Sequence, residues 1–199
     1  MEFEFTKDGI IFEKVFNDLD DFVFGFMEIL DSGNIGYVIV SGYVSILFGR
    51  SRSSEDVDMI IQDLGLEGFK KLWDKLLETY ECHNTEDPIE AYNEYLKTGH
   101  AIRFSLKNNF IPNMEVKHPK TSLDEWVLEN RKKTVVNGKT VYISPLELQI
   151  PYKLFLGSGK DIEDARHLHT LFKDKLEKDI LEDFTKKLGV GEASRKYLK

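Results

Sequence analysis

The sequence predicts an α+β domain in which a mixed β-sheet is backed by helices and followed by a helical C-terminal region. Tyr37-Val38-Ile39-Val40 is a β-rich run without polar alternation, as expected of a strand buried on both faces. Residues 133–144 predict a hairpin, because Asn137-Gly138 supplies the residues that a tight hairpin turn requires. From Ser144 onward the apolar residues recur at helical spacing.

The segment before the hairpin alternates between helical and strand patterns. The opening helix is expected at about residues 17–30, where the apolar residues share one face and acidic residues lie near the N-terminal end. Further helices are expected at 43–48, 66–80, 89–96 and 121–130, the last capped by Thr or Ser, and further strands at 56–61, 100–106 and 113–118. The last two strands are joined by a segment beginning Lys107-Asn108-Asn109, which suits a hairpin.

A boundary is expected near Ser144. Ser144-Pro145-Leu146-Glu147 combines a cap, a proline at the first helical position and a following acid, so a helix should begin there. Gly157 to Gly159 should end it, Asp161 should open the next helix, and residues 175–199 are charged and mostly helical. We therefore expect a core at residues 1–144 and a helical region at 145–199 that closes one side of a cleft.

Composition narrows the class of protein. The formal net charge of −8 argues against a broad basic surface that grips nucleic acid, although it leaves room for a local basic cleft. Cys82 is the only cysteine, so neither an internal disulfide nor a cysteine-rich zinc site is expected, which fits a reducing cytosol. The N-terminus is acidic and no apolar run is long enough to cross a bilayer. These features predict a soluble cytoplasmic protein without a membrane partner.

The pair Asp56 and Asp58 carries the strongest chemical signal. Side chains alternate across a strand, so both carboxylates should point to one face while Val57 points to the other. Two such charges repel unless a cation lies between them, and Mg²⁺ favours carboxylates together with substrate phosphates. Two Mg²⁺ ions at this strand would suit in-line phosphoryl transfer. The alternative is a pair that simply faces solvent on an edge strand.

The residues before this pair favour the metal site over that alternative. Ser41-Gly42 joins a strand to a helix, and a glycine there lets backbone N–H groups approach phosphate oxygens. Arg50-x-Arg52-x-Ser54 is a cationic, hydroxyl-bearing loop directly before the carboxylates. Together the strand, turn, helix, basic loop and Asp-x-Asp strand are far more specific than any one of them.

The segment from Val40 to Asp58 resembles the signature of the DNA polymerase β-type nucleotidyltransferase superfamily. Within it, the pattern is most similar to the abortive-infection type toxin nucleotidyltransferases and their minimal relatives. The resemblance implies divalent metal at Asp56 and Asp58 and transfer of NMP from an NTP to an acceptor. It also implies a set of nucleotide-binding residues: Ser41, Gly42, Arg50, Arg52 and Ser54. Tyr43 is a departure, since a small or hydroxyl-bearing residue is usual there.

A second segment extends the resemblance toward the C-terminus. Lys153 and the run Lys160-Asp161-Ile162-Glu163-Asp164-Ala165 are similar to a helical lysine followed by Lys-Asp-x-x-Asp. The resemblance implies that Lys153 contacts the triphosphate or stabilises developing charge, and that Lys160 and Asp161 belong to the nucleotide side. Pro151 should kink the helix and aim Lys153 inward. The alternatives are an Asp161 that caps a helix and a Lys153 exposed on one.

Glu115 is the candidate for a third carboxylate, because superfamily members commonly add one from a later strand. In the run Asn113 to His118, Glu115 and Lys117 share one strand face. The third carboxylate would complete the metal site and accept the proton of the acceptor. The alternative is a cross-strand charge pair on a solvated face.

These observations predict a Mg²⁺-dependent nucleotidyltransferase that binds an NTP. A non-catalytic module that keeps the fold and binds a nucleotide or a protein is the competing hypothesis, and Tyr43 and the unconfirmed third carboxylate are what support it. The sequence leaves the acceptor open among tRNA, a protein and a small molecule such as an aminoglycoside-like alcohol. The resemblance to toxins also leaves room for an antitoxin partner.

Overall fold

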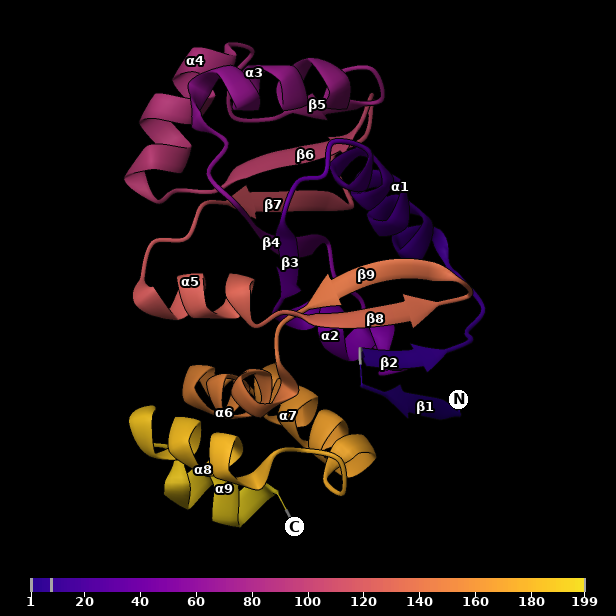
Figure 1. Cartoon of the computed structure of the whole chain (residues 1–199), viewed down its shortest axis with the longest axis vertical. Helices are drawn as coiled ribbons and strands as arrows, with labels where there is room; N and C mark the ends of the chain where they lie inside the picture. The colour runs from indigo at the N-terminus through magenta and orange to yellow at the C-terminus, as the bar shows by residue number, and fades with distance from the viewer. Residues whose placement is uncertain (1, 8, 199) are drawn as a thin grey trace.

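A computed structural model describes residues 2–7 and 9–198. In this part of the chain the strands form one nine-stranded mixed sheet, in the order β1-β2-β8-β9-β3-β4-β7-β6-β5 (Figure 1). The strands are β1 (Phe3–Thr6), β2 (Gly9–Phe12), β3 (Tyr37–Val40), β4 (Asp56–Ile61), β5 (Tyr80–Cys82), β6 (Ile102–Leu106), β7 (Asn113–Lys117), β8 (Lys132–Val136) and β9 (Lys139–Ile143). The β2–β8, β3–β9 and β4–β7 pairs are parallel and the others antiparallel. The predicted α+β class with a mixed sheet is confirmed.

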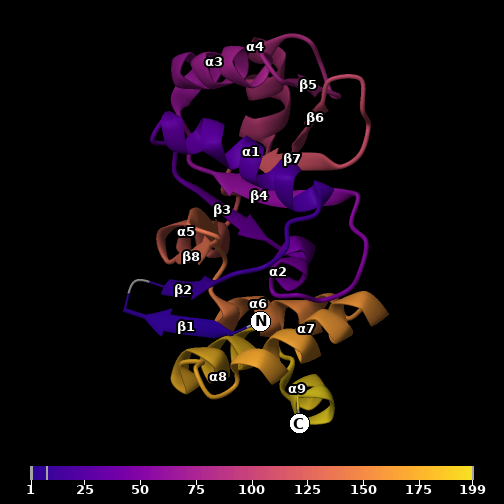
Figure 2. The ribbon, with the colours of Figure 1, turned by 90° about the vertical axis from the view of Figure 1, so that its right-hand side faces the viewer.

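Helices cover both faces and one end of the sheet. They are α1 (Asp18–Ser32), α2 (Gly42–Leu47), α3 (Gly65–Leu76), α4 (Pro88–Glu90), α5 (Ser122–Glu129), α6 (Leu146–Leu156), α7 (Gly159–Phe172), α8 (Lys178–Lys187) and α9 (Gly191–Tyr197); the π-helical η1 (Ala91–Tyr95) and the 3₁₀ helix η2 (Leu96–Thr98) continue from α4. Figures 1 and 2 show α3 and α4 at one end of the molecule and α6 to α9 at the other. The predicted helical C-terminal region is therefore present.

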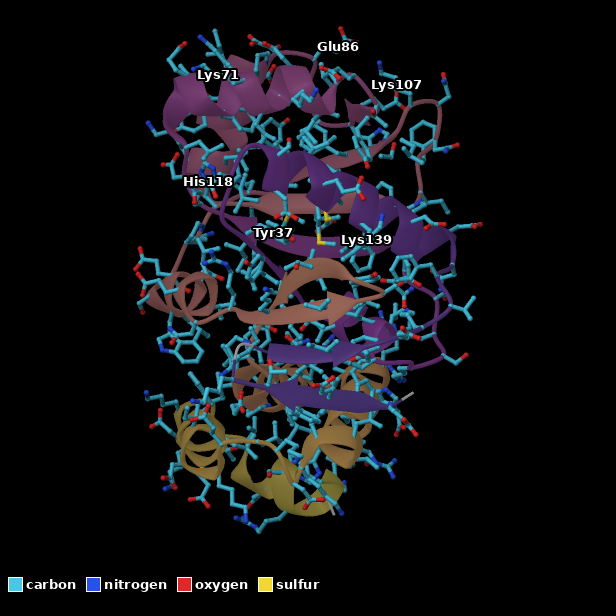
Figure 3. All side chains as sticks on the ribbon, turned by 45° about the vertical axis from the view of Figure 1, so that its right-hand side comes forward. Tyr37, Lys71, Glu86, Lys107, His118 and Lys139 are labelled. Carbon is cyan, nitrogen blue, oxygen red and sulfur yellow. The ribbon has the colours of Figure 1, made fainter. Side chains whose placement is uncertain are left out.

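Strand β4 lies near the middle of the sheet and separates two packed layers. Val57 and Met59 are fully buried in the larger core, together with residues of α1 and α3. Ile60, on the other face, packs with Val127 of α5 and Leu148 of α6 in a smaller core. Figure 3 shows side chains filling both layers, with Tyr37 at the start of β3 and His118 just beyond β7. Asp56 and Asp58 share the face of Ile60.

Local sequence signals explain the elements that were predicted correctly. Asn17 caps α1 in a reciprocal capping box with Asp20, and Thr121 does the same for α5 with Asp124. Asn137 and Gly138 have φ angles of 50° and 79°, as a tight hairpin turn between β8 and β9 requires. The β6–β7 hairpin is also antiparallel, as expected.

Three strands were not predicted. β1 and β2 form an N-terminal hairpin whose Phe3 and Phe5 contact Phe172 of α7, a long-range pairing that no local pattern reveals. The helix expected at 66–80 ends at Leu76, because Tyr80 turns into β5 and packs its ring against Phe26 of α1. Tertiary packing thus overrides helical spacing in that segment.

Two helix starts also differ from expectation. Ser144 does not cap α6; its hydroxyl donates to Gln149 Oε1 at 2.8 Å, and Pro145 occupies the cap position without a side-chain bond. α7 begins at Gly159 with Ser158 as its cap, so the alternative that Asp161 is the cap is wrong. None of the described helices has the length and apolar character that a membrane crossing requires. The division of the chain at residue 144 stays a prediction.

Candidate active site

The Ser41-Gly42 turn follows β3 and is held from α6. Ser41 has φ 62° and ψ −133°, a conformation that non-glycine residues rarely adopt. The Gln149 side chain stabilises it, since Gln149 Nε2 donates to Ser41 O at 2.6 Å and Gln149 Oε1 accepts from Ser41 N at 3.4 Å. At Gly42, a Cβ atom would lie 2.8 Å from Arg52 Nη2. A larger residue there would have to displace the Arg52 guanidinium.

Asp56 and Asp58 lie on one face of β4, as predicted. Their parallel partners on β7 are Asn113 and Glu115, so the two carboxylates and Glu115 line neighbouring strands at matched positions. Asp56 is exposed and its Oδ1 accepts a hydrogen bond from Asn113 Nδ2 at 2.7 Å. Because β4 is flanked by β3 and β7, the alternative of an edge strand is wrong.

The Asp58 carboxyl lies deeper than that of Asp56. Burial raises the pKa of Asp58, and the negative charge of Glu115 raises it further. A hydrogen bond from the Ser41 hydroxyl and the charges of Lys117 and Lys153 oppose this shift without cancelling it. The folded chain therefore resists placing an unneutralised negative charge at Asp58.

Glu115 is bound by an arginine on the neighbouring strand. Arg103 Nε donates a hydrogen bond to Glu115 Oε1 at 2.6 Å, and Arg103 Nη2 forms an ion pair with the same oxygen at 2.5 Å. The cross-strand charge pair considered from the sequence therefore exists, with Arg103 as its partner. Its presence leaves a metal-binding role for Glu115 open.

The carboxylates fit a divalent cation in part. Among the described residues, no three His, Cys, Asp or Glu side chains are gathered as a ready metal site. Asp56 and Asp58 nonetheless supply two carboxylates on one face. A cation would offset the burial and the charge of Glu115, which together raise the pKa of Asp58. Mg²⁺ is commonly held by one or two carboxylates, with substrate phosphates and water as its other ligands. The donor set therefore fits Mg²⁺ bound together with a nucleotide.

A buried carboxylate gathers the cations that the sequence assigned to phosphate binding. Asp164 of α7 is fully buried and pairs with Arg50, with Arg52 at 2.6 Å and with Lys153 at 3.1 Å. Lys153 also lies 2.7 Å from Asp161. We call these five side chains the Asp164 cluster. It joins the loop before β4 to α6 and α7.

Lys153 links this cluster to the turn. Its side chain is buried, so the alternative of an exposed helix lysine is wrong, and its Nζ lies 3.5 Å from Ser41 Oγ. The Ser41 side chain in turn lowers the pKa of Asp58. Lys153 and Ser41 therefore connect α7 to the surroundings of Asp58.

The other predicted nucleotide residues have different surroundings. Ser54 Oγ donates to Asp56 O at 2.9 Å and so shapes the start of β4. The Lys160 side chain is exposed, and its backbone carbonyl accepts a hydrogen bond from Arg50. Asp161 accepts from the Ser158 hydroxyl at 2.5 Å as well as from Lys153. The departure at Tyr43 lies in the core: its hydroxyl donates to Asp20 of α1 at 2.8 Å, away from the turn.

A cleft of about 510 Å³ opens beside Asp58 and Ser41. Its polar lining includes Lys117 and Gln149, and one wall is formed by exposed apolar side chains of α6, namely Tyr152, Phe155 and Leu156. A volume of this size accommodates a nucleotide or a small acceptor. α6 thus forms one side of the cleft.

The sequence analysis assigned no role to several residues of this site. Asp164 belongs to the second signature, three residues after Asp161 and hence on the same helix face. The signal for Gln149 is a polar residue within an apolar helical run. The contact of Arg103 with Glu115 follows from the hairpin register, which the sequence alone does not fix.

Comparisons with known proteins bear on the fold of the chain. No protein-family model and no curated protein matches the sequence. Solved structures do match. An antigenic nucleotidyltransferase-like protein from Paracoccidioides brasiliensis has a TM-score of 0.56 at 19% identity, covering 88% of this chain and 89% of that one. ANT(2'')-Ia in complex with adenylyl-2''-tobramycin has a TM-score of 0.52 at 13% identity, covering 83% and 95%.

A solution structure of the antibiotic-resistance factor ANT(2'')-Ia also matches, with a TM-score of 0.50 at 11% identity over 87% of this chain and 92% of that one. Identities this low bear on the fold alone. The matches span most of the chain and most of each neighbour. The chain therefore has the nucleotidyltransferase fold.

Proposed function

We propose that this protein is a Mg²⁺-dependent nucleotidyltransferase that transfers NMP from an NTP to a hydroxyl group of an acceptor. The observation that carries the proposal is the placement of Asp56 and Asp58 on one face of central strand β4, with Glu115 at the matched position of β7. The strained Ser41-Gly42 turn and buried Lys153 lie on the opposite side of Asp58.

The reaction forms one bond and breaks one. The acceptor oxygen attacks the α-phosphorus of the NTP, the bond from that phosphorus to the bridging oxygen breaks, and pyrophosphate leaves. The hydroxyl proton passes to a carboxylate of the site, for which Glu115 is the candidate. Asp56 and Asp58 would hold Mg²⁺, with Glu115 as a further ligand. The ion would neutralise negative charge on the phosphates.

The triphosphate would bind beside the Asp164 cluster. It holds Arg50, Arg52 and Lys153 in fixed positions, and its cations outnumber Asp161 and Asp164 by one. This excess positive charge, together with Lys160 nearby, suits the binding of a polyphosphate and the stabilisation of charge on the leaving pyrophosphate. The Ser41-Gly42 turn would contact the same phosphates, with Ser54 maintaining the loop.

The acceptor remains to be chosen among tRNA, a protein and a small molecule. One structural neighbour is described with an adenylylated tobramycin, which makes a small hydroxyl-bearing acceptor the first to test. We propose further that the enzyme acts in the cytoplasm. A toxin role with an antitoxin partner would show as growth arrest on expression and its relief by a neighbouring gene.

The second candidate is a nucleotide- or protein-binding module without activity. The Arg103 contact favours it, because the Glu115 carboxylate already has a cationic partner within the chain. Magnesium-dependent stabilisation by an NTP would support a nucleotide site under either function, whereas release of pyrophosphate would occur only with the enzyme.

The test is incubation of the protein with each labelled NTP, Mg²⁺ and either cell extract or candidate acceptors. Labelled acceptor and pyrophosphate are expected with the parent chain. Asp56→Asn should abolish both the labelling of the acceptor and the release of pyrophosphate. Because Asp56 is exposed, the melting temperature of this variant should be unchanged or raised. Asp74→Asn, at an exposed position of α3, is the matched control and should keep full activity. Transfer that persists in Asp56→Asn would refute the assignment.

A further inference from the structure

Glu115 has a charged neighbour on each side along the sheet. The register places it opposite Asp58 of β4 and opposite Arg103 of β6. Residues at directly paired positions of adjacent strands point to the same face. Asp58, Glu115 and Arg103 therefore form a row across three strands, with an acid at one end and a guanidinium at the other.

The contact between Arg103 and Glu115 lies near solvent. Arg103 Nε donates to Glu115 Oε1, and Arg103 Nη2 forms an ion pair with the same oxygen. The Arg103 side chain is 55% exposed and that of Glu115 20% exposed. Exposed ion pairs change an equilibrium constant by at most about fivefold. A divalent cation with two further carboxylate ligands would compete effectively for such a carboxylate.

Arg103 would stay beside the site after losing Glu115. Its guanidinium also lies within the electrostatic influence of Asp56. Asn84 Oδ1 accepts a hydrogen bond from the Arg103 backbone N–H at 2.8 Å, which holds the backbone of β6 at that point. The freed side chain would thus remain on the face where anionic substrate groups approach.

We propose that Arg103 is a positioning residue that exchanges partners. It binds Glu115 while no divalent cation is present. A cation that binds to Asp56 and Asp58 also takes Glu115 as a ligand. The Arg103 guanidinium is then free to bind an anionic group of the substrate. This inference rests on the proposed function. In this role, Arg103 couples the binding of the metal ion to the binding of the substrate.

The experiment measures Mn²⁺ binding to the full chain without nucleotide, from the electron paramagnetic resonance signal of free Mn²⁺. Arg103→Ala frees Glu115 and is expected to tighten Mn²⁺ binding about two- to fivefold. Arg103→Lys, which keeps the charge, should bind Mn²⁺ as the parent does. Glu115→Gln should weaken binding, and adding Arg103→Ala to Glu115→Gln should change nothing further.

Lys117→Ala is the matched control for a general effect of charge. Lys117 lies two residues from Glu115 on the same strand face, and its ion pair is with Asp124, at 3.8 Å. Removing it should tighten Mn²⁺ binding equally in the parent chain and in the Glu115→Gln background, whereas the Arg103 effect should require Glu115. Thermal unfolding confirms that each variant is folded.

The possible outcomes separate the inference from the proposed function. If Arg103→Ala leaves Mn²⁺ affinity unchanged or weaker, or acts equally in the Glu115→Gln background, the inference is wrong while the metal site stands. If the parent chain binds no Mn²⁺, with or without NTP, both the inference and the metal-dependent function are wrong.

Discussion

The Asp164 carboxylate accepts a hydrogen bond from Arg52 Nη1 at 2.6 Å, and this contact connects α7 to the loop before strand β4. Arg50 of the same loop and Lys153 of α6 bind the same carboxylate. A single buried acid therefore positions three cations that come from two separate parts of the sequence. Its loss should affect both stability and the binding of phosphates.

Asp164→Asn is expected to destabilise the fold by about 3 kcal/mol or more, since it leaves buried Lys153 and half-buried Arg50 and Arg52 without their shared counter-charge. Denaturant unfolding measures this effect. Asp161→Asn is the comparison: Asp161 contacts only one of those cations and is partly exposed, so the loss should be smaller. Equal destabilisation by the two variants would contradict the central position of Asp164.

Asp58→Asn should separate stability from function. Burial and the charge of Glu115 raise the pKa of Asp58 in the folded chain above its ordinary value of 3.8. Folding then favours the protonated form, so the contribution of Asp58 to stability is full below pH 3.8 and is lost as the pH rises through its folded pKa. At pH 7 the carboxylate therefore costs stability, and the amide should raise the melting temperature while abolishing transfer.

Thermal unfolding from pH 3 to pH 8 checks this prediction. The gain from Asp58→Asn should grow with pH up to neutrality and shrink when Mg²⁺ and NTP stabilise the parent chain. A variant that is less stable than the parent at pH 7 would show that the hydrogen bond from Ser41 outweighs the burial of the charge.

Gly42→Ala tests the close approach of Arg52 to the turn. The added methyl group would lie 2.8 Å from Arg52 Nη2, and Asp164 holds that guanidinium in place. We expect the free energy of unfolding to fall by about 1–3 kcal/mol, as when a well-packed core is overfilled, and the KM for the NTP to rise. Gly159→Ala is the control, because a Cβ there meets nothing within 4 Å. A parent-like KM in Gly42→Ala would show that Arg52 does not contact the nucleotide.

The strands and helices with strong local signals were predictable from sequence. Asn137-Gly138 specifies its turn by backbone conformation, and Asn17 and Thr121 specify helix starts by capping. The shared face of Asp56 and Asp58 followed from strand geometry alone. In each case, the residues that specify the structure lie within a few positions of it in the sequence.

The rest depends on contacts between distant segments. β2 exists as a strand because it pairs with Lys133 to Val136 of β8, more than a hundred residues later. Gly42 is expected to admit phosphate, and the Arg52 side chain that lies against it could not be foreseen from the sequence. The partner of Glu115 depended on a register that is set by the hairpin and its packing. Spacing patterns carry no information about such pairings.

The N-terminal hairpin makes the two ends of the chain depend on one another. Phe3 contacts Phe48 after α2 as well as Phe172 of α7, and β2 covers the edge of β8. A fragment lacking the C-terminal helices would expose these rings to water, and one lacking residues 1–12 would leave β8 as an open sheet edge. Either shortened chain would therefore tend to aggregate, and the chain is best studied whole.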